Sequence, residues 1–388
     1  MAFDPPTRQR PDSVEAAAEL LRALGAEGRA LRVRGGATKF GWGAAGGGTP
    51  AVEVETGGLD RVLEHNEGDF TAVLQAGVPL HRAQERFAAA GQMLALDPPL
   101  SADGGAPAAT IGGILATADS GPLRHRYGSV RDLVLGITVV LSDGTVAQAG
   151  GRVIKNVAGY DLGKLFTGSY GTLGLVATVA VRLHPLASPR VGVRGRSESP
   201  AVLSRAGARL AATPLEAECL DVAWAGGTGT VLVRFAGPAA PERAQRAAAR
   251  LSELGLEDLE VSDADEEWWE RQRAGQRSPD GAVIKVAALM GDLPVVLAAA
   301  ESQGACVVSR AALGLSWLAL RDPARLPSLL ERVCRALPEA SITVLDGAGS
   351  LADPWPALDA GALAVMERVK ARFDPARVFA PGTYVGGL

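Results

Sequence analysis

The 388-residue sequence contains little cysteine, only Cys219, Cys306 and Cys334. These three residues lie far apart and form no CxxC pair, which argues against a zinc site, an iron–sulfur cluster or a disulfide framework. The chain has no run of about 18 apolar residues and no signal-peptide core, so it predicts no transmembrane segment. We expect a cytoplasmic protein without metal ligands, in which any membrane association comes through partner chains.

Basic residues are not in excess. The chain has 39 basic and 43 acidic residues and a net charge of −4, which argues against a nucleic-acid-binding surface. Apolar residues make up 47% of the sequence. The length exceeds the roughly 250–300 residues at which one hydrophobic core stops growing, so two domains are expected.

Strand and helix patterns alternate along the chain. Asp12 followed by Glu15 is typical of a capping box and predicts a helix over residues 13–24. An apolar run over residues 133–141, the Asp143-Gly144 turn and residues 146–148 predict a β-hairpin. Prolines over residues 185–189 and the charged run after them mark a domain boundary.

Beyond this boundary, strands and helices alternate as in an α+β domain built on an antiparallel sheet. We therefore expect a first domain over residues 1–187 and a second over residues 188–350. Residues 351–388 are expected to form a helix and a tail that docks back on the first domain.

The first glycine-rich segment, Arg34 to Lys39, directly follows a short predicted strand. Its glycine amides, one hydroxyl and two cations suit a diphosphate, although a flexible surface loop remains an alternative for this segment alone. The next residues, 41–46, match the pattern GxGxxG. A Rossmann site would need a helix directly after that pattern, whereas here a strand follows, so we reject that interpretation.

A second segment, residues 109–129, begins with Gly112-Gly113 and continues with small and hydroxyl-bearing residues. A flat ligand could pack closely against such a backbone. Arg124, His125, Arg126 and Tyr127 add cations and an aromatic ring at its end. A third glycine cluster, residues 168–174, lies just before a predicted strand.

In this order, RGGATKFGWG, ATIGGILATADSGPLRHRYGS and KNVAGYDLGKLFTGSYGTLGLV resemble the FAD-binding domain of the vanillyl-alcohol oxidase / para-cresol methylhydroxylase (PCMH) family. The resemblance covers residues 13–185. It implies an α+β fold, with a two-subdomain PCMH-type FAD-binding domain and a smaller antiparallel-sheet cap domain. The ending FDPARVFAPG is similar to that of the 2-hydroxyacid branch of the family, and the total length is similar to that of the FAD-binding subunits of glycolate oxidase.

The resemblance also implies the cofactor-binding residues. The FAD pyrophosphate would lie on Arg34, Gly35, Gly36, Ala37, Thr38 and Lys39. The ribityl chain and diphosphate would lie along Thr110, Gly112, Gly113, Thr117, Ser120 and Gly121. The isoalloxazine would lie near Arg126, Tyr127 and Gly128, and the adenine end near Gly171, Gly174 and Val176. Thr38 stands where many relatives carry a flavin-linking histidine, so we predict non-covalent FAD.

Oxidation of an alcohol by hydride transfer to a flavin requires a group that accepts the hydroxyl proton, usually histidine. The chain has four histidines, and none follows His184, although hydroxyacid-oxidising relatives tend to carry histidines in the second domain. His125 is the candidate base because it lies in the segment expected near the flavin. Tyr127 and Lys285 are further candidates.

These features predict an FAD-binding subunit of a glycolate (2-hydroxyacid) oxidase or dehydrogenase that oxidises glycolate to glyoxylate. Its expected partners are a second FAD-binding subunit and an iron–sulfur subunit. One alternative is a self-sufficient FAD-dependent 2-hydroxyacid oxidoreductase. Another is a non-catalytic assembly subunit that contains flavin.

Overall fold

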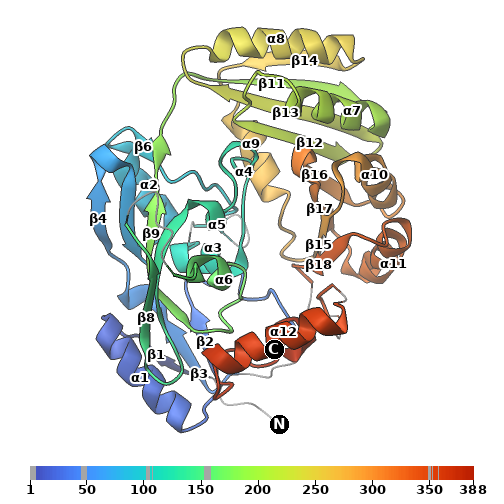
Figure 1. Cartoon of the computed structure of the whole chain (residues 1–388). Helices are drawn as coiled ribbons and strands as arrows, with labels where there is room; N and C mark the ends of the chain where they lie inside the picture. Colours follow the sequence, from blue (N-terminus) through green and yellow to red (C-terminus); the bar gives the residue numbers. More distant parts are fainter. Residues whose placement is uncertain are drawn as a thin grey trace.

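The computed structural model describes residues 6–44, 50–101, 105–106, 108–152, 159–347, 351, 353–356 and 358–388. Residues 45–46 of the GxGxxG match and residues 155–158 of the third quoted segment lie outside these ranges. The described residues form sheets of three, two, five and eight strands with helices between them, which confirms the predicted α+β class (Figure 1). No helix in these ranges is both long and apolar enough to cross a membrane.

The N-terminal part begins with a small parallel sheet in the order β1-β3-β2. Its elements are β1 (Thr7–Gln9), α1 (Val14–Ala26), β2 (Leu31–Arg34) and β3 (Val52–Glu55). Helix α1 begins after Ser13, whose side chain accepts a hydrogen bond from the Ala16 amide, so Ser13 and not Asp12 is the N-cap. Leu21 and Leu24 of α1 pack against Val54 of the sheet.

An antiparallel five-stranded sheet in the order β4-β5-β9-β7-β8 follows. Its strands are β4 (Val62–Asn66), β5 (Thr71–Gln75), β7 (Val134–Val140), β8 (Val146–Gly150) and β9 (Leu175–Arg182), and β6 (Gln92–Met93) pairs with β10 (His184–Pro185) beside it. The helices are α2 (Leu80–Ala88), α3 (Ile111–Thr117), α4 (Arg124–Tyr127), α5 (Val130–Leu133) and α6 (Leu162–Phe166). Strands β7 and β8 form the predicted hairpin.

Residues 190–346, here named the cap, contain an eight-stranded antiparallel sheet in the order β14-β11-β13-β12-β16-β17-β15-β18. The strands are β11 (Arg190–Ser197), β12 (Cys219–Ala225), β13 (Thr228–Ala236), β14 (Glu257–Ser262), β15 (Ala282–Ala287), β16 (Cys306–Arg310), β17 (Leu315–Leu320) and β18 (Ser341–Val344). The charged run after residue 189 is therefore part of β11.

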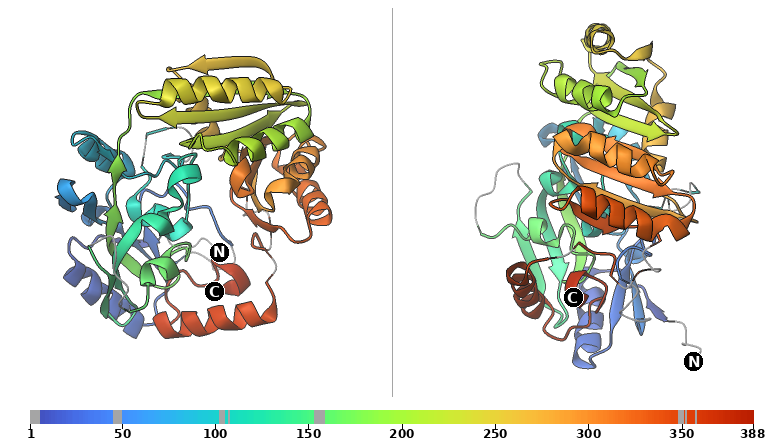
Figure 2. Two further views of the ribbon diagram at one scale, coloured as in Figure 1. Left: turned by 45° about the horizontal axis from the view of Figure 1, so that its top comes forward. Right: turned by 90° about the vertical axis from the view of Figure 1, so that its right-hand side faces the viewer.

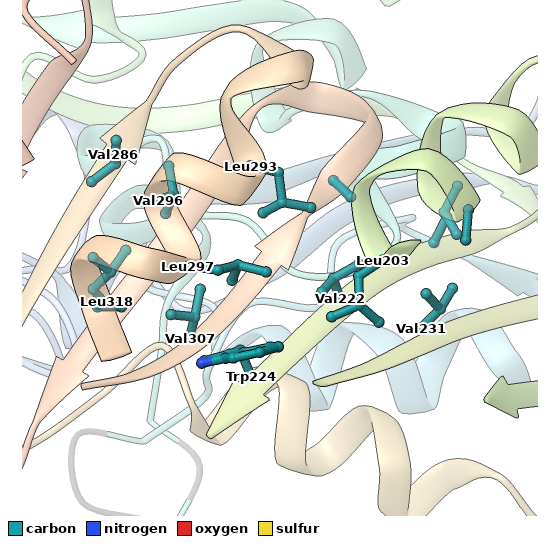
Figure 3. Close-up of a cluster of buried hydrophobic side chains, with 14 of the residues drawn as sticks. Leu203, Val222, Trp224, Val231, Val286, Leu293, Val296, Leu297, Val307 and Leu318 are labelled. Atoms are coloured by element: carbon teal, nitrogen blue, oxygen red, sulfur yellow. The ribbon is translucent and has the colours of Figure 1, made fainter. Parts of the chain in front are cut away.

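Helices cover one face of the cap sheet: α7 (Pro200–Ala211), α8 (Ala240–Glu253), α10 (Leu293–Glu301) and α11 (Leu326–Ala336) (Figure 2). Leu293 and Leu297 of α10 point into the apolar core beside Val307 of the sheet (Figure 3). The opposite face, here named the inner face, carries α9 (Glu266–Ala274) and looks toward the N-terminal part.

The last helix, α12 (Ala360–Phe373), returns to the N-terminal part. The Phe373 ring meets Phe166 edge-on at 5.6 Å. The buried ammonium of Lys370 donates to the carbonyls of Thr172 (2.7 Å) and Phe379 (2.8 Å). These contacts tie the C-terminal segment to the glycine cluster before β9.

Candidate functional site

The first glycine segment lies directly against the second. Strand β2 leads into Gly35 and Gly36, where side chains have no room: a Cβ atom at Gly36 would lie 1.7 Å from the Ala108 carbonyl oxygen. A Cβ atom at Gly35 would lie 2.3 Å from Thr110 Oγ1. The next residue, Ala37, has φ +56°. These glycines therefore allow two segments about 75 residues apart in sequence to bring their backbones together.

The second segment opens with Thr110, whose side chain caps α3 by accepting from the Gly113 amide at 3.2 Å. Gly112 lies against Ala76, because a Cβ there would be 2.7 Å from the Ala76 Cβ. The helix ends at Ala118, which has φ +50°. Gly112 and Gly113 have no side chains, so the backbone of α3 borders the space between the first and second glycine segments.

The third cluster completes the enclosure. Tyr170 and Gly171 both adopt positive φ, at +55° and +72°. A Cβ at Gly171 would meet nothing within 4 Å, so this residue borders open space. The Tyr170 ring stacks edge-on with Trp355 at 4.7 Å, which fixes its orientation.

Together the three segments line a cavity of about 840 Å³, its open mouth included. Most residues predicted to hold FAD line it: Gly35, Gly36, Ala37, Thr38, Lys39, Thr110, Gly112, Gly113, Thr117, Gly171, Gly174 and Val176. Exposed glycine backbone suits a diphosphate, and the apolar rings in the lining suit flat heterocycles, so the residues present fit FAD.

The remaining predicted residues, Arg34, Ser120, Gly121, Arg126, Tyr127 and Gly128, are not among the residues that line this cavity. Gly121 packs on the chain, since a Cβ there would be 1.8 Å from the Asp97 carbonyl oxygen. Gly128 faces Asp132 of α5, 2.7 Å from a Cβ built on it. Arg126 donates to the Glu216 carbonyl at 3.0 Å. These contacts are with other residues of the chain. That the six residues bind FAD stays a prediction.

Two of the expected diphosphate cations already have anionic partners. Arg34 pairs with Glu53 at 3.1 Å, and Lys39 pairs with Asp119 at 3.1 Å. Both side chains of the second pair are nearly inaccessible, at 5% and 3% exposure. The cavity also contains a cation that the sequence analysis missed, Arg32, which lies over the Phe40 ring at 3.7 Å. Burial is the largest influence on the pKa of Arg32, and it lowers this pKa. Its position two residues before Arg34 on β2 was the available signal.

Two of the three candidate bases, His125 and Tyr127, differ in environment. Burial, and next the charge of Arg126, lowers the pKa of His125, and no described residue forms a hydrogen bond with its Nδ1 atom. Tyr127 donates to Glu218 of the cap at 3.3 Å and packs on the His184 ring at 4.7 Å. Burial, and next the charge of Glu218, raises the pKa of Tyr127 to about 12. Tyr127 therefore keeps its proton at neutral pH.

The inner face of the cap packs against the loop that follows the first glycine segment. Trp42, four residues after Thr38, packs there with Val308 and Trp317, a contact that the sequence analysis did not anticipate. Lys285 lies opposite Trp317 in the sheet register, with its ammonium 5.7 Å from the Trp317 ring. It makes no hydrogen bond or ion pair within the described part of the chain. Burial, and next the charge of Arg124, lowers the pKa of Lys285.

Comparison with known proteins identifies a family for the N-terminal part of the chain. Residues 6–150 match the family model described as "FAD binding domain". Residues 6–150 belong to this FAD-binding family. The family and cofactor predicted from the glycine segments are thus confirmed.

Relatives with described activities match the same part of the chain. Glycolate oxidase subunit GlcE of Escherichia coli is 36% identical over 137 residues, 35% of this chain and 37% of that protein. Mitochondrial D-2-hydroxyglutarate dehydrogenase of Bos taurus is 36% identical over 179 residues, 45% of this chain and 31% of that protein. Glycolate oxidase subunit GlcD of Bacillus subtilis is 39% identical over 128 residues, 33% of this chain and 26% of that protein. Each match therefore spans less than half of the relative.

The fold extends over nearly the whole chain. A solved structure of alkyldihydroxyacetonephosphate synthase superimposes with a TM-score of 0.71 at 15% identity, covering 96% of this chain and 76% of that one. At this identity the similarity concerns the fold, and it confirms the predicted PCMH-type architecture.

Proposed function

We propose that this protein is the FAD-binding subunit of a glycolate (2-hydroxyacid) oxidase or dehydrogenase that converts glycolate to glyoxylate together with partner chains. The FAD-binding domain supports the redox chemistry, and the names of the matched relatives support a 2-hydroxyacid as substrate. We further propose a second FAD-binding subunit and an iron–sulfur subunit as partners. Two matched relatives are named as different subunits of glycolate oxidase, which supports a multi-subunit assembly.

The observation that carries this proposal is the Lys285 ammonium on the inner face of the cap, for which the described residues provide no ion-pair partner. Lys285 shares its surroundings with Arg124, Arg310 and Asp119, the groups whose charges act on its pKa. Asp119 is already paired with Lys39, and Arg310 faces Asp221 at 3.6 Å. A partly buried ammonium to which the described residues bring no anion favours a ligand that brings one. The carboxylate of a small hydroxyacid is such a group.

A proton acceptor is the second requirement of this chemistry. Bound FAD would supply the hydride acceptor. His125 is the candidate base, because its lowered pKa keeps the imidazole neutral and no described residue forms a hydrogen bond with its buried Nδ1 atom. His125 is not among the residues that line the cavity, so we retain the alternative in which a partner subunit carries the principal hydroxyacid site.

The test uses the full chain purified alone. Glycolate is added anaerobically, and the flavin absorbance is followed. Bleaching supports hydroxyacid oxidation by this chain and contradicts a non-catalytic assembly role. An unchanged flavin contradicts the self-sufficient enzyme, and the experiment is then repeated with the co-purified complex. Failure of the complex to reduce its flavins with glycolate would refute the proposal.

The role of Lys285 is tested with Lys285→Met, which keeps the length of the side chain and removes its charge. We expect the KM for glycolate to rise about tenfold or more, because a hydrogen bond to a charged group contributes about 1.5–3 kcal/mol. Lys164→Met is the matched control, since Lys164 is about half exposed and pairs locally with Asp161. Equal KM values for Lys285→Met and the unmodified chain would contradict carboxylate binding at this position.

A further inference from the structure

Two consecutive cap residues just after α9 reach both glycine-rich segments of the N-terminal part. Arg277 donates through NH1 to the Thr38 carbonyl in the first segment at 2.9 Å. Gln276 donates through Nε2 to the Ser120 carbonyl in the second segment at 2.9 Å. We name Gln276 and Arg277 the α9 clamp. One short stretch of the cap thus holds two loops that are far apart in sequence.

The clamp is anchored firmly in the cap. The Arg277 guanidinium binds the Asp346 carboxylate through Nε (3.0 Å) and NH2 (3.1 Å), and this carboxylate also accepts from the Ser278 amide at 2.8 Å. Gln276 is 1% exposed, and its Oε1 atom accepts from NH2 of the fully buried Arg310 at 2.6 Å. Two-point, charge-assisted hydrogen bonds away from water fix direction as well as distance.

Asp346 also contacts the loop that follows the first glycine segment. Trp42 Nε1 donates to Asp346 Oδ1 at 3.0 Å, and the Trp42 side chain is 4% exposed. The loop from Thr38 to Trp42 is therefore fixed to the cap at both ends, by its carbonyl at one end and by an indole N–H at the other. All of these atoms lie outside the described helices and strands of the N-terminal part, so regular secondary structure does not hold them.

Both clamped segments have backbone conformations that need external support. Ala37 precedes Thr38 with φ +56°, and Ala118 lies two residues before Ser120 with φ +50°. A residue with a Cβ atom is sterically strained at positive φ, and it keeps this conformation when the surrounding structure enforces it. The clamp hydrogen bonds fall one and two residues away from these strained alanines.

We propose that the α9 clamp sets the separation of the two glycine segments and thereby the affinity for FAD. Gln276 and Arg277 do not line the cavity, whereas Thr38 and Thr117 do, so the clamp residues are positioning residues that act through the loops. Cofactor binding is then a property of both parts of the chain, although the family match ends at residue 150. The inference needs FAD binding alone and is independent of the substrate.

The test is FAD titration into flavin-depleted full-length protein, followed by the quenching of flavin fluorescence. Arg277→Lys keeps the charge but loses the fork that joins Asp346 to Thr38. Gln276→Met keeps the length of the side chain but loses its amide. We expect each variant to raise the Kd for FAD about tenfold, through faster release, as removal of one well-placed hydrogen bond does.

Arg273→Lys is the matched control, because Arg273 lies one turn earlier on α9 and contacts Asp97 of the N-terminal part at 3.8 Å. It touches neither carbonyl held by the clamp. We expect this variant to leave the Kd for FAD unchanged. An equal loss of affinity in Arg273→Lys would show general loosening of the cap and overturn the proposal.

Urea unfolding of each apoprotein separates positioning from stability, since a purely structural role lowers stability without changing the Kd of the molecules that remain folded. If Arg277→Lys does not fold, Asp346→Asn replaces it, because the amide keeps the shape of the carboxylate and loses its charge. Unchanged Kd values in Gln276→Met and in the folded variant of the Arg277–Asp346 pair would refute the clamp.

Discussion

Lys39 provides the sharpest test of how the cofactor loop is held. Its ammonium lies 3.1 Å from Asp119 Oδ2, and it also donates to Thr38 Oγ1 (3.2 Å) and to the Pro99 carbonyl (3.3 Å). Lys39→Met removes the cation and leaves a carboxylate that is 3% exposed without its ion-pair partner, held only by the Ser120 amide among the described residues. Loss of one partner of a buried ion pair costs about 3–5 kcal/mol, so we expect the apoprotein to lose about that much free energy of unfolding.

The assay is urea unfolding of the flavin-depleted chain, followed by far-UV circular dichroism, on Lys39→Met, Asp119→Asn and the double variant. The double variant should lose less than the sum of the single losses, because neither partner then remains charged and buried. A loss below about 1 kcal/mol in Lys39→Met would refute the reasoning, since exposed ion pairs typically contribute no more than that. Weaker FAD binding at unchanged stability would instead identify Lys39 as a phosphate ligand.

Two further predictions concern the flavin linkage and one buried acid. Thr38 in place of a histidine predicts non-covalent FAD, so acid precipitation should leave a colourless polypeptide of unmodified mass, and yellow protein would contradict this. Burial raises the pKa of Asp97 to about 7. Folding then takes up a proton between about pH 4 and 7, so the free energy of unfolding should fall as the pH rises through this window. Asp97→Asn should flatten that decline in urea unfolding, and identical pH profiles would contradict it.

Short sequence patterns predicted the structure correctly where residues close together in the sequence determine it. The Asp143-Gly144 turn between two apolar runs predicted a hairpin, and β7 and β8 form it. Strand β11 was missed because its charges are paired across the sheet. Val191 and Val193 face the core, while Arg194 on the other side pairs with Glu260 of β14. The partner lies 66 residues away, so the run appeared in the sequence as a solvated boundary.

The candidate site was predicted only in part, also because some of its contacts join residues that are far apart in the sequence. Glycine patterns report backbone requirements, and the segments that carry them do line the cavity. The partners of individual side chains depend on tertiary structure. Asp119 is 80 residues from Lys39, and Arg277 is 239 residues from Thr38, so neither contact leaves a local signal. The contacts of the cap with the two glycine segments are therefore the part that the sequence could not reveal.

The charge pairing around the first glycine segment also changes how the cofactor is held. Arg34 and Lys39 already face Glu53 and Asp119, so their charges are largely compensated before any diphosphate arrives. We therefore propose that binding of the diphosphate depends mainly on backbone amides and on Arg32, and backbone amides bind an anion only when the loop has the correct shape. Contacts that fix this shape from a distance should therefore matter as much as residues that touch the cofactor, which is why variants of the clamp and of the buried ion pair are more informative than further neutralisation of surface cations.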